Sequence, residues 1–418
     1  MNAAVQSPSS HPGRERTVIV GAGHSGGRAA EALRAADPAR EIILIGSEGH
    51  PPYERPPLSK AVLAGTAAVR DSYLHPAAWY GEQGIALKLS TKVAAINRAA
   101  QVLVLGDGSR LSYDTLLLTT GARARTLPVA GATEPAVLYL RDISDAERLA
   151  ARLGPGVVLA VIGAGFIGLE VAASSRFLAS AVHVIELAAQ PLGRVIHPAI
   201  GRWVAELHRR NGVHLHLGRT VQTIESAGAA RRLVLDNGTS IVADVIVAGV
   251  GAVPNTELAR AAGLKVQDGI ITDAEGRTSD PAIRAAGDCT RHFNPLLGRY
   301  IRLESWQNAQ DQAIAVARCM ANIEHPHAEI PWFWSDQYDM NLQVLGIAEP
   351  AVPLVWRGDP DGSDFIAFSL EGQRIAAATG VNRSKEMAVV RRIMQRGIAV
   401  DPAVLADPST KLMTLVRG

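Results

Sequence analysis

The sequence predicts an α/β protein that ends in a small α+β domain. Two stretches, beginning near residues 17 and 159, each contain an apolar strand, a glycine-rich turn, a helix and a second strand. A hairpin followed by an apolar strand recurs after each stretch, and from about residue 324 onward the composition changes to alternating polar and apolar residues. Two βαβ units in one chain indicate two domains with parallel sheets, and the later alternation indicates antiparallel strands.

Composition limits the classes of protein to consider. A chain of 418 residues exceeds one ordinary hydrophobic core, so two or three domains are expected. The formal charge of +2 gives no overall case for a nucleic acid or an acidic membrane surface as partner. The apolar runs are too short for a membrane span. Residues 1–13 lack the regions of a signal peptide, and we expect a disordered tail.

Cysteine usage is sparse. Cys289 and Cys319 provide no disulfide framework and no paired zinc ligands, so no metal site is expected. This usage fits a reducing cytoplasm. Any oxidation–reduction chemistry would have to come from a cofactor.

The stretch 159–186 has the order of features of a dinucleotide-binding, Rossmann-like unit. Gly163 permits a tight turn, Gly165 lets the backbone approach a pyrophosphate, and Gly168 lets the helix pack closely on the strand. Glu186 ends the second strand, where a carboxylate accepts hydrogen bonds from an adenosine ribose and repels the 2′-phosphate of NADP. This unit therefore predicts an NAD site.

A first unit of the same kind stands near the N-terminus. The strand Thr17 to Val20 leads into the turn Gly21-Ala22-Gly23-His24-Ser25-Gly26, and a second strand, Ile42 to Ile45, is followed by Ser47-Glu48. Glu48 is the favoured ribose ligand, but Ser47 stands where an acid is otherwise expected, so the choice between them stays open. Two such units imply two nucleotides held face to face, one FAD and the other NAD.

A proline-rich segment, His50 to Lys60, follows the first unit. Its four prolines exclude a regular helix or a central strand, and we expect a rigid loop that leads into a helix near Ser59. The plain interpretation is a surface loop with a solvated lysine. Its position after a nucleotide-binding strand favours instead a Lys60 ammonium beside a flavin ring, where it stabilises negative charge.

An internal repeat explains why the second unit lies in mid-chain. Residues 101–122 and 232–252 each form a hairpin with a glycine turn, then an apolar strand and a glycine-rich crossing near Gly121 or Gly251. The simplest organisation inserts the second domain into the first. The predicted domains are 14–121 with 252–325 for FAD, 122–251 for NADH, and 326–418 for the α+β domain.

Two later segments complete the predicted flavin site. Gly287 permits close approach, and Asp288 is placed to accept a hydrogen bond from a ribityl hydroxyl, although an aspartate that caps a helix is an alternative. A helix follows from residues 304–309 to Met320, and its N-terminal end is expected to face the pyrimidine edge of the flavin.

The C-terminal segment is expected to form a small sheet and one helix. Alternation over 337–346 and 364–377 predicts strands, and 384–395 predicts a helix. The dense aromatic group Trp332 to Trp334 is most often ordinary core. Three arginines form either a solvated basic face or a contact for an acidic partner: Arg391, Arg392 and Arg396.

Five segments together resemble one family: PYERPPLSK, VIGAGFIGLEVA, TSDPAIRAAGDC, ESWQNA and PWFWSDQ. They are similar to the FAD-dependent NADH:ferredoxin reductases of bacterial oxygenase systems, of the putidaredoxin reductase and biphenyl dioxygenase reductase type. The resemblance covers nearly the whole chain after the tail. It implies a glutathione-reductase-like arrangement of two Rossmann-like domains, one inserted in the other, with non-covalent FAD and with NADH.

The resemblance also implies a set of cofactor contacts. Those expected around FAD are Gly21, Gly23, His24, Ser25, Gly26, Ser47 or Glu48, Arg55, Lys60, Val93, Thr120, Gly121, Arg141, Gly251, Gly287, Asp288, Glu304, Ser305, Trp306 and Trp334. Those expected along NADH are Gly163, Gly165, Phe166, Ile167, Gly168, Glu170, Glu186 and Arg194. Glu170 is expected to pair with Lys60. Lys60, Glu170 and Asp288 are catalytic only in the sense that they hold and tune the reactive site.

The implied reaction is hydride transfer from NADH to the flavin, followed by two single-electron transfers to a small [2Fe-2S] ferredoxin with an acidic docking face. That ferredoxin would serve a monooxygenase or dioxygenase in the cytoplasm. A disulfide- or peroxide-reducing enzyme is disfavoured, because the proline-rich segment contains no cysteine. A rubredoxin or monodehydroascorbate reductase and a FAD- and NAD-binding signalling protein remain alternatives. The oligomeric state stays open.

Overall fold

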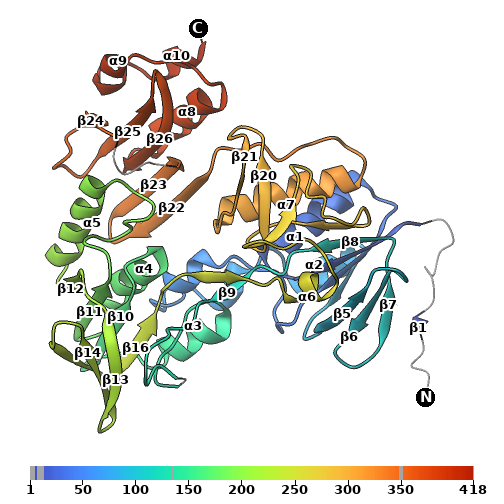
Figure 1. Ribbon diagram of the computed structural model, residues 1–418, viewed down its shortest axis with the longest axis horizontal. Coiled ribbons are helices and arrows are strands. Elements are labelled where there is room, and N and C mark those ends of the chain that lie inside the picture. The colour runs from blue at the N-terminus through green and yellow to red at the C-terminus, as the bar shows by residue number, and fades with distance from the viewer. Residues whose placement is uncertain (1–4, 7–13, 134, 348–351, 418) are drawn as a thin grey trace. The chain divides into compact units, whose positions relative to one another are not determined.

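The computed structural model describes residues 5–6, 14–133, 135–347 and 352–417. It divides into two compact units, each assembled from three stretches of chain. Figure 1 labels the helices and strands and colours them by residue number. Unit 1 comprises Met1–Arg55, Arg70–Arg123 and Val253–Glu329. Unit 2 comprises Pro56–Val69, Ala124–Ala252 and Ile330–Gly418, so the segment that carries Lys60 belongs to it.

Unit 1 is built on a five-stranded parallel sheet in the order β19-β8-β2-β3-β4. Its strands are β2 Arg16–Val20, β3 Glu41–Ile45, β4 Ile85–Lys88, β8 Thr115–Leu118 and β19 Ile283–Ala285. Two helices, α1 His24–Ala36 and α7 Trp306–Met320, pack against each other and bury Leu33 and Val316 with one face of the sheet. The alternate strand residues, such as Val18 and Ile43, face a second core cluster.

The other elements of unit 1 are short. A four-stranded sheet in the order β1-β7-β6-β5 supplies the second core cluster with Leu103 and Leu111. The predicted tail lies outside the described residues except for strand β1, which pairs in parallel with β7. The remaining bounds are β1 Val5–Gln6, η2 Val69–Ser72, α2 Ala77–Glu82, β5 Val93–Asn97, β6 Val102–Leu105, β7 Arg110–Ser112, α6 Glu257–Ala261, β18 Ile270–Thr272, β20 Thr290–Asn294 and β21 Arg299–Ile301.

Unit 2 contains a second parallel sheet, in the order β12-β11-β10-β16. Its strands are β10 Val158–Ile162, β11 Ala181–Glu186, β12 His214–Leu217 and β16 Val245–Ala248, and its helices are α3 Ile143–Ala150, α4 Phe166–Ser175 and α5 Pro198–Arg210. A three-stranded antiparallel sheet buries Ile224 and Leu233 against the parallel one: β13 Val221–Ala227, β14 Ala230–Leu235 and β15 Ser240–Ala243. The hairpins that the internal repeat predicts are thus present in both units.

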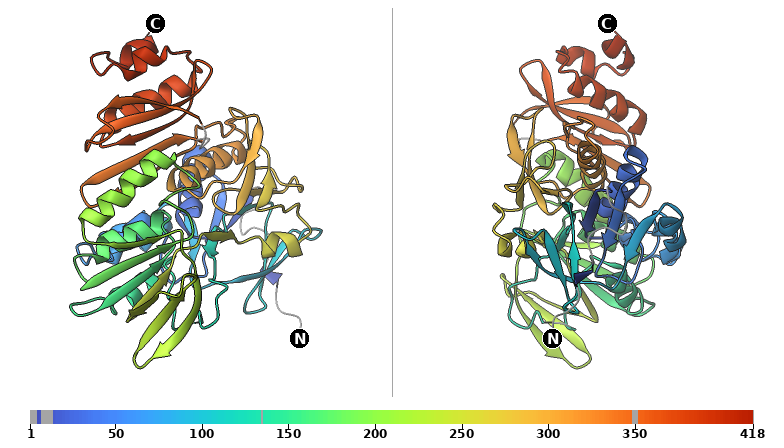
Figure 2. Two further views of the ribbon diagram at one scale, coloured as in Figure 1. Left: turned by 60° about the vertical axis from the view of Figure 1, so that its left-hand side comes forward. Right: turned by 90° about the vertical axis from the view of Figure 1, so that its right-hand side faces the viewer.

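The C-terminal part of unit 2 is a five-stranded antiparallel sheet in the order β22-β23-β26-β25-β24. It is drawn in orange and red in Figure 2. Its elements are β22 Trp332–Gln337, β23 Met340–Gly346, β24 Leu354–Gly358, β25 Phe365–Glu371, β26 Arg374–Val381, α8 Ser384–Gln395, α9 Pro402–Ala406 and α10 Met413–Arg417. Helix α8 has the predicted bounds and packs on β26 and β23. The aromatic group lies on β22 and is half-buried, and Trp332 packs against the core of this domain.

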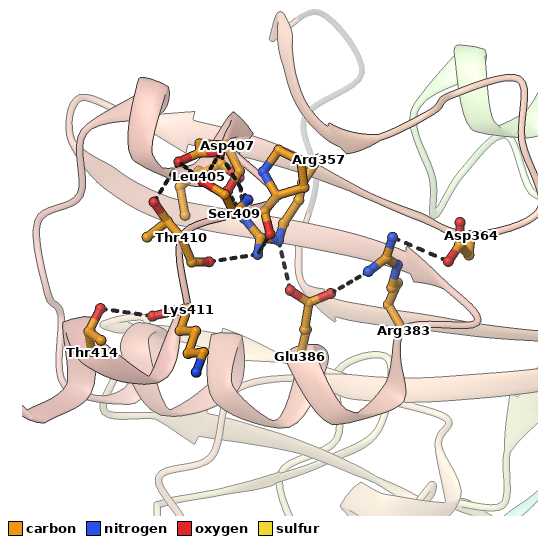
Figure 3. Close-up of polar contacts among 11 residues, drawn as sticks. Arg357, Asp364, Arg383, Glu386, Leu405, Asp407, Ser409, Thr410, Lys411 and Thr414 are labelled. Atoms are coloured by element: carbon orange, nitrogen blue, oxygen red, sulfur yellow. Dashed lines mark hydrogen bonds and ion pairs between the residues drawn. The ribbon is translucent and has the colours of Figure 1, made fainter.

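Arg357 fastens the last segment of the chain to this sheet (Figure 3). Its guanidinium is buried, donates to the carbonyl oxygens of Leu405, Asp407 and Thr410, and pairs through Nε with Glu386 at 2.8 Å. One cation therefore satisfies carbonyl groups at the C-terminal end of α9 and in the loop that follows it.

Two connections differ from or refine the prediction. The expected helix near Ser59 is instead a four-residue 3₁₀ helix, η1 Pro56–Ser59, that ends there. Its two prolines fix φ and lack the N–H donors that an α-helix would use, so only a short turn forms. Strands β9 Ala122–Ala124 and β17 Ala252–Pro254 lie where the chain passes between the units, next to the predicted crossings at Gly121 and Gly251.

Among the described residues, no helix has both the length and the apolar character that a membrane crossing requires. The same residues contain no group of three or more metal-ligating side chains placed to hold a metal ion.

Candidate functional site

Packing within the protein requires glycine at the first and last positions of both turns. Gly21 and Gly163 have φ of +116° and +101°, and a Cβ there would lie 2.2 and 2.5 Å from a neighbouring carbonyl oxygen. A Cβ on Gly26 or Gly168 would lie 1.9 or 2.0 Å from the carbonyl oxygen of the first glycine of its own turn. These four positions therefore exclude any side chain.

The middle glycines of the two turns, Gly23 and Gly165, have open space around them. A Cβ on Gly23 would find its nearest atom, Nη2 of Arg55, at 4.0 Å, and a Cβ on Gly165 would find its nearest at 3.9 Å. The protein does not require glycine here, so the space suits a group that approaches the backbone. The two residues are the N-caps of α1 and α4 and offer no side-chain cap, whereas Ser305 caps α7. Helix N-termini of this kind bind phosphate through free N–H groups and the helix dipole.

Glu186 lies beside the second glycine turn. Its Oε2 accepts a hydrogen bond from the backbone N–H of Ala164 at 2.6 Å, and its Oε1 accepts one from Ala188 at 2.8 Å. The carboxylate is only half-buried, so it retains capacity for a ribose hydroxyl. Arg194, in the segment that follows, is exposed. The structure therefore places Glu186 beside the turn, where the sequence expects it, with its carboxylate fixed by two backbone N–H groups.

The first unit has no acid at the matching position. Gly21 donates its N–H to Ile45 at 2.8 Å, as Gly163 does to Ile185 at 2.8 Å, so the residue that corresponds to Glu186 is Gly46. The next residue, Ser47, is exposed.

Glu48 is held by the proline-rich segment. Its Oε1 pairs with Arg55 at 2.9 Å, and its Oε2 accepts from the hydroxyl of Tyr53 at 2.6 Å. The sequence missed the role of Tyr53, which is fully buried and anchors this carboxylate.

Three segments of unit 1 converge beside the first turn. The ring of His24 lies 4.9 Å from that of Trp306, and a Cβ on Gly287 would lie 2.8 Å from Oγ of Ser25. Burial, together with Arg28 and Arg55, lowers the pKa of His24 to about 3, so the imidazole is neutral at pH 7. Both of its ring nitrogens and Oγ of Ser25 are buried without a hydrogen-bond partner among the described residues. Buried polar atoms of this kind indicate the place of a polar ligand.

The other expected flavin contacts are divided between the units. Val93, Thr120, Asp288, Glu304 and Ser305 lie in unit 1, and Asp288 is half-buried. Lys60, Arg141, Gly251 and Trp334 lie in unit 2. Glu304 is exposed and pairs with Arg302, and Trp334 stacks on Trp332 with 5.3 Å between ring centroids.

Lys60 and Glu170 form the expected ion pair, with 2.8 Å between Nζ and Oε1. Glu170 lies on α4 and is 3% exposed. Ser59 donates to its Oε2 at 2.5 Å, and Ser335 on β22 donates to its Oε1 at 2.6 Å. A buried carboxylate requires hydrogen-bond partners of this kind, and Glu170 has three of them.

This ion pair continues into a chain of hydrogen bonds that the sequence did not reveal. Gln337 donates to Oγ of Ser335 at 2.9 Å and accepts from Nε2 of His208 at 2.7 Å, while Nδ1 of His208 lies 3.2 Å from the hydroxyl of Tyr338. The available signal was the alternation of Ser335 and Gln337, which places two polar side chains on one face of a strand.

The cysteines do not supply a redox thiol. Both are free and buried, and the thiol of Cys289 contacts the carbonyl oxygen of Ala286. Burial raises the pKa of Cys289, which disfavours the thiolate that disulfide chemistry requires.

Two glycine turns of the same geometry, each opening a helix without a side-chain cap, define a class: oxidoreductases that bind two dinucleotides. Residues 15–313 match the pyridine nucleotide-disulphide oxidoreductase family, and residues 332–416 match the reductase C-terminal family. The chain belongs to the pyridine nucleotide-disulphide oxidoreductase family. It is therefore a flavoprotein oxidoreductase that uses FAD and NAD(H), and the predicted fold class, with two Rossmann-like domains and a small α+β domain, is confirmed.

Similar proteins cover nearly the full chain. The ferredoxin--NAD(+) reductase component of an anthranilate 1,2-dioxygenase system from Burkholderia cepacia is 45% identical over 402 residues, which covers 96% of this chain and 98% of that protein. Putidaredoxin reductase from Pseudomonas putida is 39% identical over 410 residues, with 97% of each covered. A crystal structure of a covalent putidaredoxin reductase–putidaredoxin complex has a TM-score of 0.92 at 38% identity and covers 96% of this chain and 98% of that one.

Proposed function

We propose that this enzyme passes electrons from NADH through FAD to a small [2Fe-2S] ferredoxin that serves a monooxygenase or dioxygenase. The observation that carries the proposal is the likeness over the whole chain, including the reductase C-terminal region, to reductases whose names specify a ferredoxin acceptor. When bound, FAD would supply the ability to accept a hydride and to release electrons singly.

We assign FAD to unit 1 and NADH to unit 2. The FAD assignment rests on the open space at Gly23, on the unpartnered buried atoms of His24 and Ser25, and on the nearby residues Gly287 and Trp306. The predicted FAD residues 14–121 with 252–325 contain all of these. Arg55 and Asp288 would complete the polar contacts there.

The NADH assignment rests on the second turn. Gly165 leaves space for a pyrophosphate, and Glu186 is fixed beside it for a ribose. Phe166, Ile167 and the buried Glu170 follow on α4 and would line the nicotinamide side. Lys60, paired with Glu170, would stabilise negative charge on the flavin.

We further propose an acidic docking face on the ferredoxin. Arg391 and Arg392 lie on α8, and the guanidinium of Arg391 is 5.9 Å from the ring centroid of Trp332. Complementary charge speeds the encounter of two proteins, and salt weakens that effect. The cytoplasm is the proposed location, since free cysteines fit a reducing compartment.

The test is an electron-transfer assay with defined acceptors. NADH should bleach the yellow protein, and reduction of cytochrome c should require an added [2Fe-2S] ferredoxin such as recombinant putidaredoxin. The rate should fall as the salt concentration rises. Equal reduction of cytochrome c without ferredoxin would contradict the proposed partner. Faster turnover with rubredoxin or monodehydroascorbate would identify that molecule as the acceptor instead of a ferredoxin.

A further inference from the structure

We infer that His208 and Gln337 are positioning residues. Through Ser335, they keep the carboxylate of Glu170 oriented in its ion pair with Lys60 during flavin reduction. The inference rests on the proposed role of the Lys60–Glu170 pair. Each residue acts on Glu170 through the next hydrogen bond in one chain: His208 bonds to Gln337, Gln337 to Ser335, and Ser335 to Glu170. All four residues lie within unit 2.

The hydrogen bonds of this chain all run in the same direction, from donor to acceptor. Because Nε2 of Gln337 donates to Ser335, its Oε1 must accept, and Nε2 of His208 must carry the proton. Nδ1 of His208 then accepts from the hydroxyl of Tyr338. Ser335 in turn donates to Glu170 at 2.6 Å. Every donor therefore points toward the carboxylate, and bonds aligned in this way polarise one another.

The chain of hydrogen bonds fixes the orientation of the Ser335 hydroxyl. A hydroxyl rotates to suit its surroundings and can donate in more than one direction. The N–H of Gln337 occupies the acceptor side of Ser335, so the hydroxyl proton is directed to Oε1 of Glu170, the same oxygen that pairs with Lys60. The ammonium is thereby held by a carboxylate of fixed orientation.

His208 suits this role because it remains uncharged. It is fully buried, and burial lowers its pKa to about 4, against a smaller opposing effect of the bond to Gln337. A neutral imidazole donates from one nitrogen and accepts at the other, as the chain requires. His208, Gln337 and Glu170 come from α5, β22 and α4, so the chain also links three elements of unit 2.

The experiment measures flavin reduction by NADH alone, in anaerobic rapid mixing, with the complete FAD-loaded enzyme. Removing the chain with His208→Leu or Gln337→Leu should lower the limiting reduction rate about fivefold or more, because Glu170 loses an oriented donor. The dissociation constant of NADH should change less than about twofold, since the pyrophosphate and ribose are bound elsewhere.

Conservative variants separate positioning from general destabilisation. His208→Gln places an amide N–H near the position of Nε2 and should restore the rate to within about twofold of the unaltered enzyme. Ser335→Ala removes the last donor with little change of volume and should reproduce the defect, which provides a second route if a leucine variant does not fold. Tyr300→Phe, on an exposed side chain of unit 1, is the matched control.

Two results would overturn the inference: an unchanged reduction rate in His208→Leu and Ser335→Ala, or His208→Gln as slow as His208→Leu. Because no ferredoxin is present, these outcomes do not depend on the proposed acceptor. An unaltered enzyme that fails to reduce any ferredoxin would instead refute the proposed function. The inference would still be tested by the rates of flavin reduction in the variants.

Discussion

Oε2 of Glu186 lies 2.6 Å from the backbone nitrogen of Ala164, so the acid at the end of β11 is fastened to the glycine turn of its own βαβ unit. In the NADH site that we propose, the turn and the acid would act as one recognition element. The 2′-phosphate of NADPH would then meet a carboxylate that cannot easily move away, which would disfavour NADPH.

The first prediction concerns cofactor choice. Combining Glu186→Ala with Leu187→Arg removes the repelling carboxylate and adds a cation at a side chain that is 72% exposed. The ratio of kcat/KM for NADH over NADPH should fall by about tenfold or more, since hydrogen bonds to charged groups contribute about 1.5–3 kcal/mol. Steady-state kinetics with both cofactors measures it. Glu257→Gln, an exposed acid of unit 1, should leave the ratio unchanged; an unchanged ratio in the double variant would remove Glu186 from the site.

The second prediction concerns the buried ion pair. Lys60→Met should slow flavin reduction by about 100-fold, the size of effect seen when one electrostatic donor is removed from a reactive site. Glu170→Gln should also slow it, and the double variant should be no slower than the worse single variant because the two groups act together. Rapid mixing with NADH gives the three rates, and simple additivity would argue against a functional pair.

The third prediction concerns the anchor of the C-terminal segment. Arg357→Leu should lower the free energy of unfolding by about 3 kcal/mol, because it leaves several carbonyl groups and Oε1 of Glu386 without their partner, while Glu386 keeps its ion pair with Arg383. Urea titration followed by circular dichroism measures the loss, and limited proteolysis should cut first near residues 405–410. Arg210→Ala is the control: its ion pair with Glu206 is exposed, so the change should stay below about 0.5 kcal/mol.

Local signals made much of this architecture predictable. Gly21, Gly163 and Glu186 mark their βαβ units through short-range steric and chain-order requirements, and helix α8 follows from its hydrophobic period alone. The hairpins around Gly108 and Gly238 were equally readable, because a turn of positive φ needs glycine.

The hydrogen-bond chain behind Glu170 was not predictable in the same way. Ser335 lies 165 positions from Glu170, and Gln337 lies 129 positions from His208. No local preference specifies such partners; only the tertiary fold brings Ser335 and Gln337 of β22 next to Glu170 and His208. The same limit applies to Tyr53 and Glu48, which are close in sequence but meet only because the proline-rich segment folds back.

The last prediction concerns pH. Burial lowers the pKa of His24, His183, His208 and His292 well below the ordinary value of 6.5, so the folded protein takes up these protons less readily than the unfolded chain. Stability should therefore be fully present above about pH 6.5 and fall as the pH drops from there toward 4, by up to about 1.4 kcal/mol per pH unit for each such histidine. Urea titrations of the FAD-loaded enzyme between about pH 7.5 and 5.5 measure the slope, in a range where carboxylates contribute little. His208→Gln should reduce the slope by about half a proton near pH 6.5 and by close to one proton near pH 5.5, because it removes one of the groups that the unfolded chain protonates. Tyr338→Phe keeps the imidazole and should leave the slope as it is; a flat profile in the unaltered enzyme, or an equal slope in His208→Gln, would contradict a neutral buried His208.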